Sequence, residues 1–363
     1  TGGTTVPLPG PGPCSGSVRW RFVLSLIFAT IKMMTDSVHL SSQQGPGTAD
    51  RGTASDEAAI SAYRALAQWW GGSARDFPWR FGKTTPWGIL VSEVMSQQTP
   101  MSRVLPYWEK WMGTWPDPQA VSEASTAEII SAWGHLGYPR RALRLQECAR
   151  TLVRDCDGRL PASYDGLTAL PGIGDYTASA VLSFAFGIRI PVIDTNIRRV
   201  LVRVFDGAES TGGAAGAHDR ELAAKVLPAG SRQSVVWNQS VMELGAVVCT
   251  AKKPCCAVCP LNSLCRFYAA GLPGLGQKPT RPRQKFRGTN RYVRGLVLKA
   301  LRQAEAETGP GTAAGTQRRS RSVSYSELKS LWNDTVQLDG CIASLDEDGL
   351  IVINKDHSVS LPR

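Results

Sequence analysis

The sequence lacks any apolar run long enough to cross a lipid bilayer. The stretch from Val23 to Ile31 follows two arginines and superficially resembles a signal peptide, but it is short and no clean small-residue cleavage site follows it. Residues 1–54 are rich in Gly, Pro, Ser and Thr without a sustained period, which predicts a disordered leader. The chain begins with threonine and methionines follow at 33 and 34, so an over-extended start is favoured over a targeting segment. We expect no membrane association.

Cysteine is scarce outside one short segment. Four of the nine cysteines are scattered along the chain: Cys14, Cys148, Cys156 and Cys341. This distribution is a poor pattern for a disulfide framework and suits a reducing compartment, so we expect a cytoplasmic protein. The other five lie between residues 249 and 265 and are either metal ligands or a chance cluster.

Acidic residues are outnumbered by basic ones, 30 to 41, which gives a formal net charge of +11 and a pI near 9.4. This imbalance favours a polyanionic partner, nucleic acid in particular. The length of 363 residues, 42% of them hydrophobic, is sufficient for two folded units.

Alternating strand patterns are missing from most of the chain. From Asp56 the run EAAISAYRALAQWW has apolar residues at helical spacing behind Ser55, the expected N-cap. Helical patterns then follow one another to about Tyr268, which predicts an all-α domain over residues 55–270. A basic segment with several prolines and no acidic residue, 271–288, is expected to be a linker.

The C-terminal part, residues 289–363, predicts a smaller α+β domain. A helix is expected over 291–303, a low-complexity insertion over about 304–322, and further helical segments after it. The final LIVINKDHSVSLP alternates apolar and polar residues about a Lys-Asp turn, as a β-hairpin does. Three helices followed by a hairpin are the plan of a winged helix, although an unspecified small α+β cap fits the same pattern.

A glycine hairpin occurs in the middle of the predicted all-α domain. In the segment LPGIGDYTA, Gly172 and Gly174 precede a helical run, so backbone N–H groups at the helix start can bind an anion such as a DNA phosphate. An ordinary interhelical turn explains the same residues. Further along, Asp194 stands before a helix with one apolar face. It is either the N-cap of that helix or, with Arg198 and Arg199 beside it, a carboxylate directed toward DNA.

One acidic residue is embedded in an apolar helical segment, 86–99. Glu93 lies among Ile89, Leu90, Val94 and Met95. A carboxyl group held against such neighbours has a raised pKa, which suits a proton donor near neutral pH. A solvated glutamate on an exposed face is the weaker alternative, because few charged residues accompany it.

These features occur in an order that resembles the helix-hairpin-helix DNA glycosylase superfamily. The Leu-Pro-Gly-x-Gly hairpin, the helix after it and the Val-x-Asp segment carry the resemblance, which extends over roughly residues 55–268. The segment SEVMSQQT, which contains Glu93, resembles the signature of the adenine-specific, MutY-type branch. The segments FPWR at 77–80 and WNQSVMELG at 237–245 look like its paired adenine-pocket segments. On composition alone, both would be core helices with aromatic packing.

The resemblance implies a base excision repair enzyme that hydrolyses the N-glycosidic bond of adenine mispaired with 8-oxoguanine or guanine. In this scheme Glu93 protonates adenine at N7, and Asp194 stays ionised to stabilise an oxocarbenium-like sugar or its covalent adduct. Tyr176 orders the pair and its water, and Asn196 belongs to the same catalytic set. The related endonuclease III branch carries at the position of Tyr176 a lysine that forms a Schiff base. A phenol cannot do so, which implies a monofunctional glycosylase.

The resemblance also implies how substrate is bound. The residues expected around the extruded base are Trp79, Arg80 and Glu243. The residues expected to enter the duplex beside the lesion are Gln98, Leu136 and Tyr138, with helix-end packing as their alternative, above all for Leu136. The implied partner is double-stranded DNA containing an adenine mispair, bound by a monomer in the bacterial nucleoid.

Two features depart from the adenine-specific pattern. Thr195 stands where that branch has glycine, and endonuclease III-like proteins often show threonine there, so a glycosylase with AP lyase activity stays the alternative. Nothing after Gly288 resembles the Nudix-like domain with which longer members inspect 8-oxoguanine. A non-enzymatic iron-sulfur winged-helix protein that binds DNA is a third interpretation, but it leaves the hairpin, Glu93 and Asp194 without a role.

The clustered cysteines follow the pattern C-x6-C-x2-C-x5-C if Cys249, Cys256, Cys259 and Cys265 are chosen. Taken alone, four thiolates hold either zinc or an iron-sulfur cluster. Their place at the end of a glycosylase-like domain resembles the family's 4Fe-4S loop, which implies that cofactor and leaves Cys255 as the spare. Three basic residues of this loop are expected to face DNA phosphates: Lys252, Lys253 and Arg266.

Overall fold

The computed structural model describes residues 51–210, 213–277, 285–307 and 322–363. Most of the expected leader, and parts of the expected linker and low-complexity insertion, lie outside these ranges. Contacts divide the chain into two units, 1–58 and 59–363, and the second contains every candidate site residue. Within the described ranges, no helix is long and apolar enough to cross a membrane.

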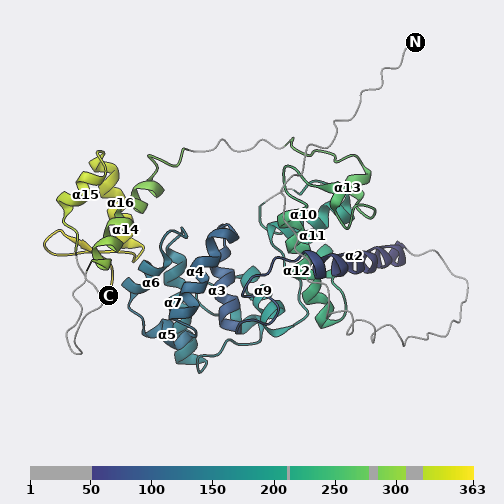
Figure 1. The fold of residues 1–363 in the computed structure, drawn as a ribbon, viewed down its shortest axis with the longest axis horizontal. Coiled ribbons are helices and arrows are strands. Elements are labelled where there is room, and N and C mark those ends of the chain that lie inside the picture. Colours follow the sequence, from purple (N-terminus) through teal and green to yellow (C-terminus); the bar gives the residue numbers. More distant parts are fainter. Residues whose placement is uncertain (1–50, 211–212, 278–284, 308–321) are drawn as a thin grey trace, which may run out of the picture. The chain divides into compact units, whose positions relative to one another are not determined.

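Helix α2 (Arg51–Ser73) opens the described part of the chain (Figure 1). It begins at Arg51, so the expected N-cap at Ser55 was wrong and residues 51–54 are helical instead of part of a disordered leader. The segment RGTAS contains no proline and a single glycine, which allows the helix to extend toward the N-terminus. Ala62 and Leu66 of this helix are fully buried.

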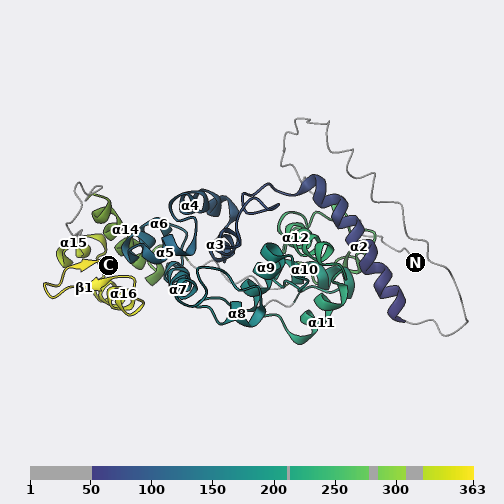
Figure 2. The same ribbon diagram turned by 90° about the horizontal axis from the view of Figure 1, so that it is seen from below.

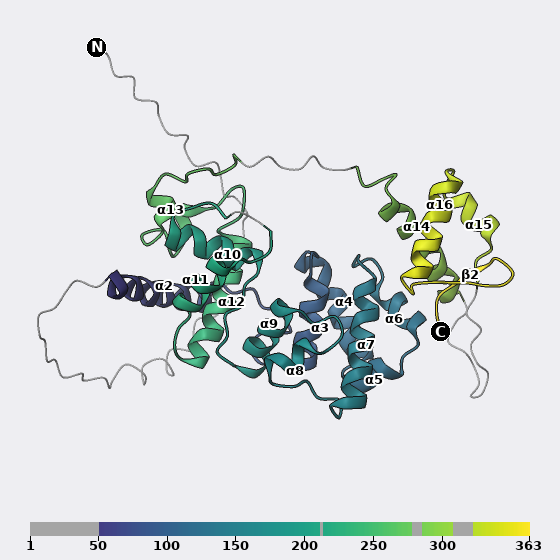
Figure 3. The same ribbon diagram turned by 180° about the vertical axis from the view of Figure 1, so that it is seen from behind.

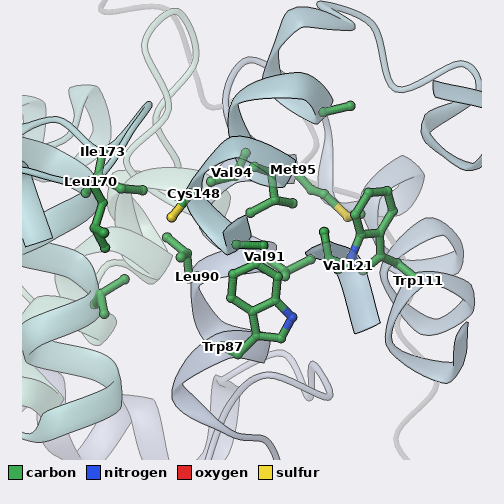
Figure 4. Close-up of a cluster of buried hydrophobic side chains, with 14 of the residues drawn as sticks. Trp87, Leu90, Val91, Val94, Met95, Trp111, Val121, Cys148, Leu170 and Ile173 are labelled. Carbon is green, nitrogen blue, oxygen red and sulfur yellow. The ribbon is translucent and has the colours of Figure 1, made fainter. Parts of the chain in front are cut away.

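Seven helices that follow share one hydrophobic core. Figures 1 and 2 show these helices grouped beside one another. They are α3 (Pro86–Ser96), α4 (Met101–Thr114), α5 (Pro118–Glu123), α6 (Thr126–Trp133), α7 (Arg140–Asp155), α8 (Tyr164–Thr168) and α9 (Asp175–Phe186). Helix α3 is the most deeply enclosed, because all its residues from Trp87 to Met95 are buried (Figure 4). Thr85 caps it by accepting a hydrogen bond from the Gly88 N–H, and Pro86 occupies its first turn. The apolar segment therefore forms a helix that is covered on every side.

A second core joins α2 to α10 (Thr195–Leu201), a π-helical turn (Val202–Asp206), α11 (Ala217–Val226) and α12 (Ser231–Val247). A 3-10 turn (Cys256–Val258) and α13 (Arg266–Ala269) follow α12 along the chain. Helix α9 belongs to both cores, because Ala178 and Val181 pack into the first and Ala180 into the second. Its N-terminal turn, which carries Tyr176, therefore lies where the two cores meet.

The glycine hairpin joins α8 to α9. Leu170 and Ile173 anchor it, since both side chains are buried in the first core. Gly172 has φ +79°, and a Cβ there would lie 2.9 Å from the Cβ of Arg144. Both the backbone conformation and the space therefore require glycine at this position. Gly174 is the N-cap of α9 and lines the cleft described below, and the first N–H groups of that helix receive no side-chain cap from it.

In its described residues, 285–307 and 322–363, the C-terminal part contains three helices and a β-hairpin. Figure 3 shows these elements grouped together. They are α14 (Asn290–Ala306), α15 (Tyr325–Leu331), α16 (Thr335–Glu347), β1 (Val352–Ile353) and β2 (Val359–Ser360). The strands are antiparallel, with Val352 opposite Ser360, and the predicted Lys-Asp turn lies between them. A bridge from Val323 adds a third short segment to the pair. The predicted fold class, helical with a small C-terminal α+β part, is confirmed.

The C-terminal part shares its core with helix α6. Ala127 and Ile130 of α6 pack with buried residues of α14 and α16, such as Leu301 and Leu345. Two polar contacts reinforce this packing: Arg302 donates to the Gly134 carbonyl at 3.0 Å, and Arg140 pairs with Asp348 at 3.3 Å. The C-terminal helices are therefore fastened to the seven-helix core by both apolar and polar contacts.

Replacing Ile130 by alanine tests this attachment. Ile130 is fully buried, so the cavity is expected to cost about 2–4 kcal/mol of local stability. Amide hydrogen exchange should then become faster in residues 290–306 and 335–347 as well as in α6. Ile60→Ala is the control, because that side chain is 51% exposed, and it should change neither region. Unchanged exchange in α14 and α16 of the Ile130 variant would show that α6 does not support them.

Candidate active site

A cleft of about 950 Å³ opens beside the junction of the two cores. It is lined by the end of α3, the glycine hairpin, the start of α10 and one side of α12. Eight residues expected from the sequence line it: Arg80, Gln98, Gly172, Gly174, Tyr176, Asp194, Asn196 and Glu243. Segments far apart in the sequence thus contribute to one concave surface.

Glu93 lies in the middle of α3 and is 8% exposed. The Tyr176 hydroxyl donates a hydrogen bond to its Oε2 at 2.8 Å. Burial raises the pKa of Glu93 from 4.5 to about 7, with a further rise from the charge of Asp194, while the Tyr176 hydrogen bond and Arg80 act in the opposite sense. Burial, followed by the charges of Glu93 and Asp194, also raises the pKa of Tyr176 well above its usual value. The predicted apolar environment of Glu93 is confirmed.

Asp194 is the N-cap of α10. Its Oδ1 accepts from the Ile197 N–H at 2.6 Å, and its Oδ2 accepts from the Asn196 side chain at 2.8 Å. The same carboxylate lines the cleft, so its two expected roles are compatible. Burial raises the pKa of Asp194, while the hydrogen bonds from Ile197 and Asn196 and the charge of Arg199 limit the rise.

The two arginines after Asp194 do not project toward solvent. Arg198 and Arg199 are 3% and 7% exposed. Arg199 donates to the side-chain oxygen of Asn196 at 2.8 Å, to the Gly245 carbonyl at 2.6 Å and to the Cys249 carbonyl at 2.8 Å. The Arg199 guanidinium therefore joins Asn196, which orients Asp194, to α12 and to the start of the cysteine segment.

Glu243 on α12 is saturated by arginine donors. Its Oε1 accepts from the Arg75 backbone N–H and Nε, and its Oε2 accepts from Arg75 Nη2 at 2.9 Å and Arg80 Nη2 at 2.8 Å. Burial alone would raise the pKa of Glu243, but the hydrogen bonds and charges of the two arginines outweigh it and lower the pKa. Four acceptor directions of the carboxylate are thus occupied, so Glu243 holds the arginines in place.

Trp79 and Arg80 border a second, small cavity of about 40 Å³ that also reaches Glu93. Trp79 stacks on Phe77 with centroids 4.9 Å apart, and the Arg80 guanidinium lies 5.0 Å from both the Trp70 and Phe77 rings. The cavity has room for no more than a few water molecules. A base entering it therefore requires these side chains to move apart.

The three residues expected to enter a duplex differ in accessibility. Gln98 and Tyr138 are exposed and have the positive φ values of 55° and 49°. Leu136 is 2% exposed and packs in the first core, so it is not accessible for insertion in this structure. Two residues later in the same loop, the Tyr138 side chain is 44% exposed.

Sequence reasoning missed Arg75 and Arg141. Arg75 precedes the FPWR segment, and an arginine next to clustered aromatics was its only signal. Arg141 donates to the carbonyls of Val94, Met95 and Gln97 at 2.7–3.1 Å and to the Gly137 carbonyl at 3.0 Å. Burial lowers its pKa to about 10. This residue ties the end of α3 to the loop that carries Tyr138.

The clustered cysteines line a cavity of their own. Cys249, Cys256, Cys259 and Cys265, together with Cys255, surround it. Arg203 donates to the Cys249 sulfur at 3.4 Å. Within the described ranges, no three Cys, His, Asp or Glu side chains converge as a single metal ion requires. Lys252 and Lys253 are exposed, whereas Arg266 is tethered to the Phe205 carbonyl at 2.7 Å.

Glu93→Gln should make the protein more stable at neutral and higher pH. The pKa of Glu93 rises from 4.5 to about 7 on folding, so the wild type loses stability as the pH rises through this interval. Glutamine does not ionise. The free energy of unfolding of the variant should therefore rise relative to that of the wild type by as much as about 3 kcal/mol between pH 4 and pH 8. Chemical unfolding at several pH values measures it, with the exposed Glu109→Gln as the control. A difference that stays constant with pH contradicts the raised pKa.

Comparisons with known proteins agree with this architecture. Residues 91–216 match the family model described as HhH-GPD superfamily base excision DNA repair protein. Adenine DNA glycosylase of Mycobacterium tuberculosis H37Rv is 42% identical over 299 residues, covering 82% of this chain and 92% of that protein. The Mycolicibacterium smegmatis protein of that name is 42% identical over 297 residues, covering 82% and 94%.

Solved structures show the same fold. A thermostable thymine-DNA glycosylase aligns with a TM-score of 0.55 at 28% identity, over 60% of this chain and 99% of that chain. An endonuclease III–DNA complex aligns with a TM-score of 0.52 at 22% identity, over 60% and 98%, which supports the fold alone. The sequence identity to the mycobacterial proteins and the matched family model identify the family. The chain belongs to the adenine DNA glycosylase family of the HhH-GPD superfamily.

Proposed function

We propose that the protein removes adenine from duplex DNA in which it is mispaired with 8-oxoguanine or guanine, by hydrolysis and without AP lyase activity. The observation that carries the proposal is the buried Glu93 carboxyl with a pKa of about 7, hydrogen-bonded to Tyr176 beside Asp194. A pair of carboxyl groups in different environments is what cleavage of an N-glycosidic bond requires. The family assignment supports adenine as the base.

The two carboxyl groups have different tasks in this reaction. Near neutral pH a large fraction of Glu93 is protonated and can donate to N7 of adenine, which makes the base a better leaving group. Asp194, held by the Ile197 N–H and Asn196, supplies negative charge to the developing oxocarbenium ion. Tyr176 stays a neutral phenol because its pKa is raised, so it orients Glu93 and forms no imine.

Base extrusion uses the surfaces around this pair. Exposed Tyr138 and Gln98 are suited to fill the space left in the duplex, and the first N–H groups of α9 after Gly174 are suited to bind a phosphate. Trp79 and Arg80 border the space in which the base would lie. Glu243 acts on the base indirectly, by holding Arg80 and Arg75 in position. DNA binding by a monomer is sufficient for all these contacts.

We further propose a 4Fe-4S cluster held by Cys249, Cys256, Cys259 and Cys265. Four cysteines around one cavity, in the spacing C-x6-C-x2-C-x5-C at the end of the glycosylase domain, support this cofactor. When bound, the cluster would crosslink the segment from α12 to α13 through its thiolates. Arg203 and Arg199 contact Cys249, so a fixed position of Cys249 would also stabilise the position of α10.

One feature supports an alternative function. Thr195, the residue typical of the endonuclease III branch, lines the cleft beside Asp194. A glycosylase with AP lyase activity would need an amine at the reacting sugar, and the cleft has no lysine in its lining, among the described residues. The monofunctional reaction is therefore favoured. A purely DNA-binding role would not explain why a glutamate with a raised pKa is buried beside the cleft.

Incubation with a duplex containing adenine opposite 8-oxoguanine tests the function. Strand breaks should occur only after alkali treatment, because hydrolysis leaves an abasic site intact. Glu93→Gln should reduce the single-turnover rate by at least about 100-fold while duplex binding persists, since only the proton donor is lost. Glu109→Gln on α4 is the exposed control. Absence of alkali-labile sites contradicts the glycosylase, and breaks without alkali indicate a lyase.

Iron content tests the cluster. Purified wild-type protein should contain about four irons per chain and absorb broadly in the blue, as 4Fe-4S proteins do. Cys259→Ser should lose most of the iron, because one of the four thiolates is removed. Cys255→Ser is the matched control in the same cavity and should retain the iron. Zinc in the wild type, or equal loss in the two variants, contradicts the assigned ligand set.

A further inference from the structure

Helix α14 of the C-terminal part runs beside the loop that carries Tyr138. Near one end of the helix, Arg302 donates to the Gly134 carbonyl at 3.0 Å. Near the other end, the Arg291 guanidinium lies 5.7 Å from the Tyr138 ring centroid and 3.4 Å from its hydroxyl. The residue best placed to enter a duplex is therefore in contact with the C-terminal part.

The side of α14 next to this loop is basic. At 100° per residue, Arg291, Lys299 and Arg302 lie within about 80° of one another around the helix axis. The buried residues Val293, Val297, Leu298 and Leu301 occupy the adjoining side of the helix, and Leu298 lies at the border with the basic face. The exposed positions between the cations include Gly295, whose missing side chain leaves open space.

The pKa of His135, in the same loop, is affected by two of these cations. Burial lowers the pKa of this histidine, and the charges of Arg302, Lys299 and Arg103 lower it further. Two of the three cations come from α14 and one from α4. Cations from both parts of the molecule thus lie near the loop, as binding of a DNA backbone requires.

Aromatic groups accompany these charges. Phe286, just before α14, is 52% exposed, and Arg291 lies 5.1 Å from its ring. Tyr138, whose ring lies 5.7 Å from the same guanidinium, is 44% exposed. A guanidinium close to exposed aromatic rings is a common element of nucleic-acid surfaces, because rings can stack on bases and the cation can bind phosphate.

The third helix has the opposite charge. In helix-turn-helix and winged-helix proteins, a later helix commonly enters the major groove. Here α16 has the sequence TVQLDGCIASLDE, with three acidic residues and no basic one. Phosphates would repel it. Helix α14 has four basic residues and one acidic residue, so charge favours the first helix as the DNA-binding element.

We propose that the exposed face of α14 that carries Arg291 and Lys299 binds the phosphate backbone of duplex DNA next to the position where the base leaves the stack, while Arg302 holds the adjacent loop. Phe286 and Tyr138 border this face. The C-terminal part thereby extends the DNA-binding surface of the glycosylase cleft, and it does so through its first helix. This inference rests on the proposed function for the choice of duplex DNA as partner.

The salt dependence of binding tests the proposal. The probe is a fluorescent duplex with 8-oxoguanine opposite 2′-fluoro-2′-deoxyadenosine, which resists hydrolysis. Removing two phosphate contacts in Arg291→Ala/Lys299→Ala should weaken binding about tenfold or more near 0.1 M salt and reduce the slope of log Kd against log salt by about 2. Arg291→Lys/Lys299→Arg retains the charges and should keep the slope.

The matched control is Lys329→Ala/Lys355→Ala. It removes two exposed cations from the same C-terminal part, on α15 and in the hairpin turn, and should leave the slope unchanged. An unchanged slope in the α14 variant, or an equal loss in the control, overturns the proposal. The wild-type excision assay is independent of this comparison: if adenine is not removed, the proposed function fails, while the slopes still decide whether α14 binds DNA.

Discussion

Burial of carboxyl groups in and beside the cleft is the constraint on which the rest of the site depends. Glu93 and Glu243 are both buried, yet their pKa values move in opposite directions. Glu243 receives four hydrogen bonds from two arginines and stays ionised, whereas Glu93 receives one from a phenol and has a pKa of about 7. The arginines of the site thus pair with Glu243, which has a structural role. Glu93, which is suited to donate a proton, is hydrogen-bonded to no cation among the described residues.

The two cores determine how these groups meet. Helix α3 brings Glu93 from the first core, α10 and α12 bring Asp194 and Glu243 from the second, and α9 packs into both. Close packing of α10 on α12 is enforced by Gly245, where a Cβ would lie 2.7 Å from the Asn196 Cβ. Arg199 crosses the same contact toward Cys249. The geometry around Asp194 consequently depends on the segment that carries the cysteines.

Local signals in the sequence predicted much of this arrangement. The apolar segment around Glu93, the glycine hairpin and the cap at Asp194 each depend on neighbours within a few residues, and all three occur as predicted. The saturation of Glu243 could not be predicted, because Arg75 is 168 residues away and its partner is set by packing. Leu136 is buried for a similar reason, since its burial depends on how the loop closes over the first core.

The loop from 134 to 138 connects the C-terminal part to the proposed proton donor. Arg302 of α14 holds the loop at Gly134, and Arg141 holds Gly137 together with the carbonyls of Val94 and Met95, directly after Glu93. Each link is a hydrogen bond to a backbone carbonyl, which changes position only if the main chain moves. The Arg141 guanidinium that contacts the loop is the same one that fixes the end of α3. Backbone contacts thus join α14, the loop and the helix that carries Glu93 in one series.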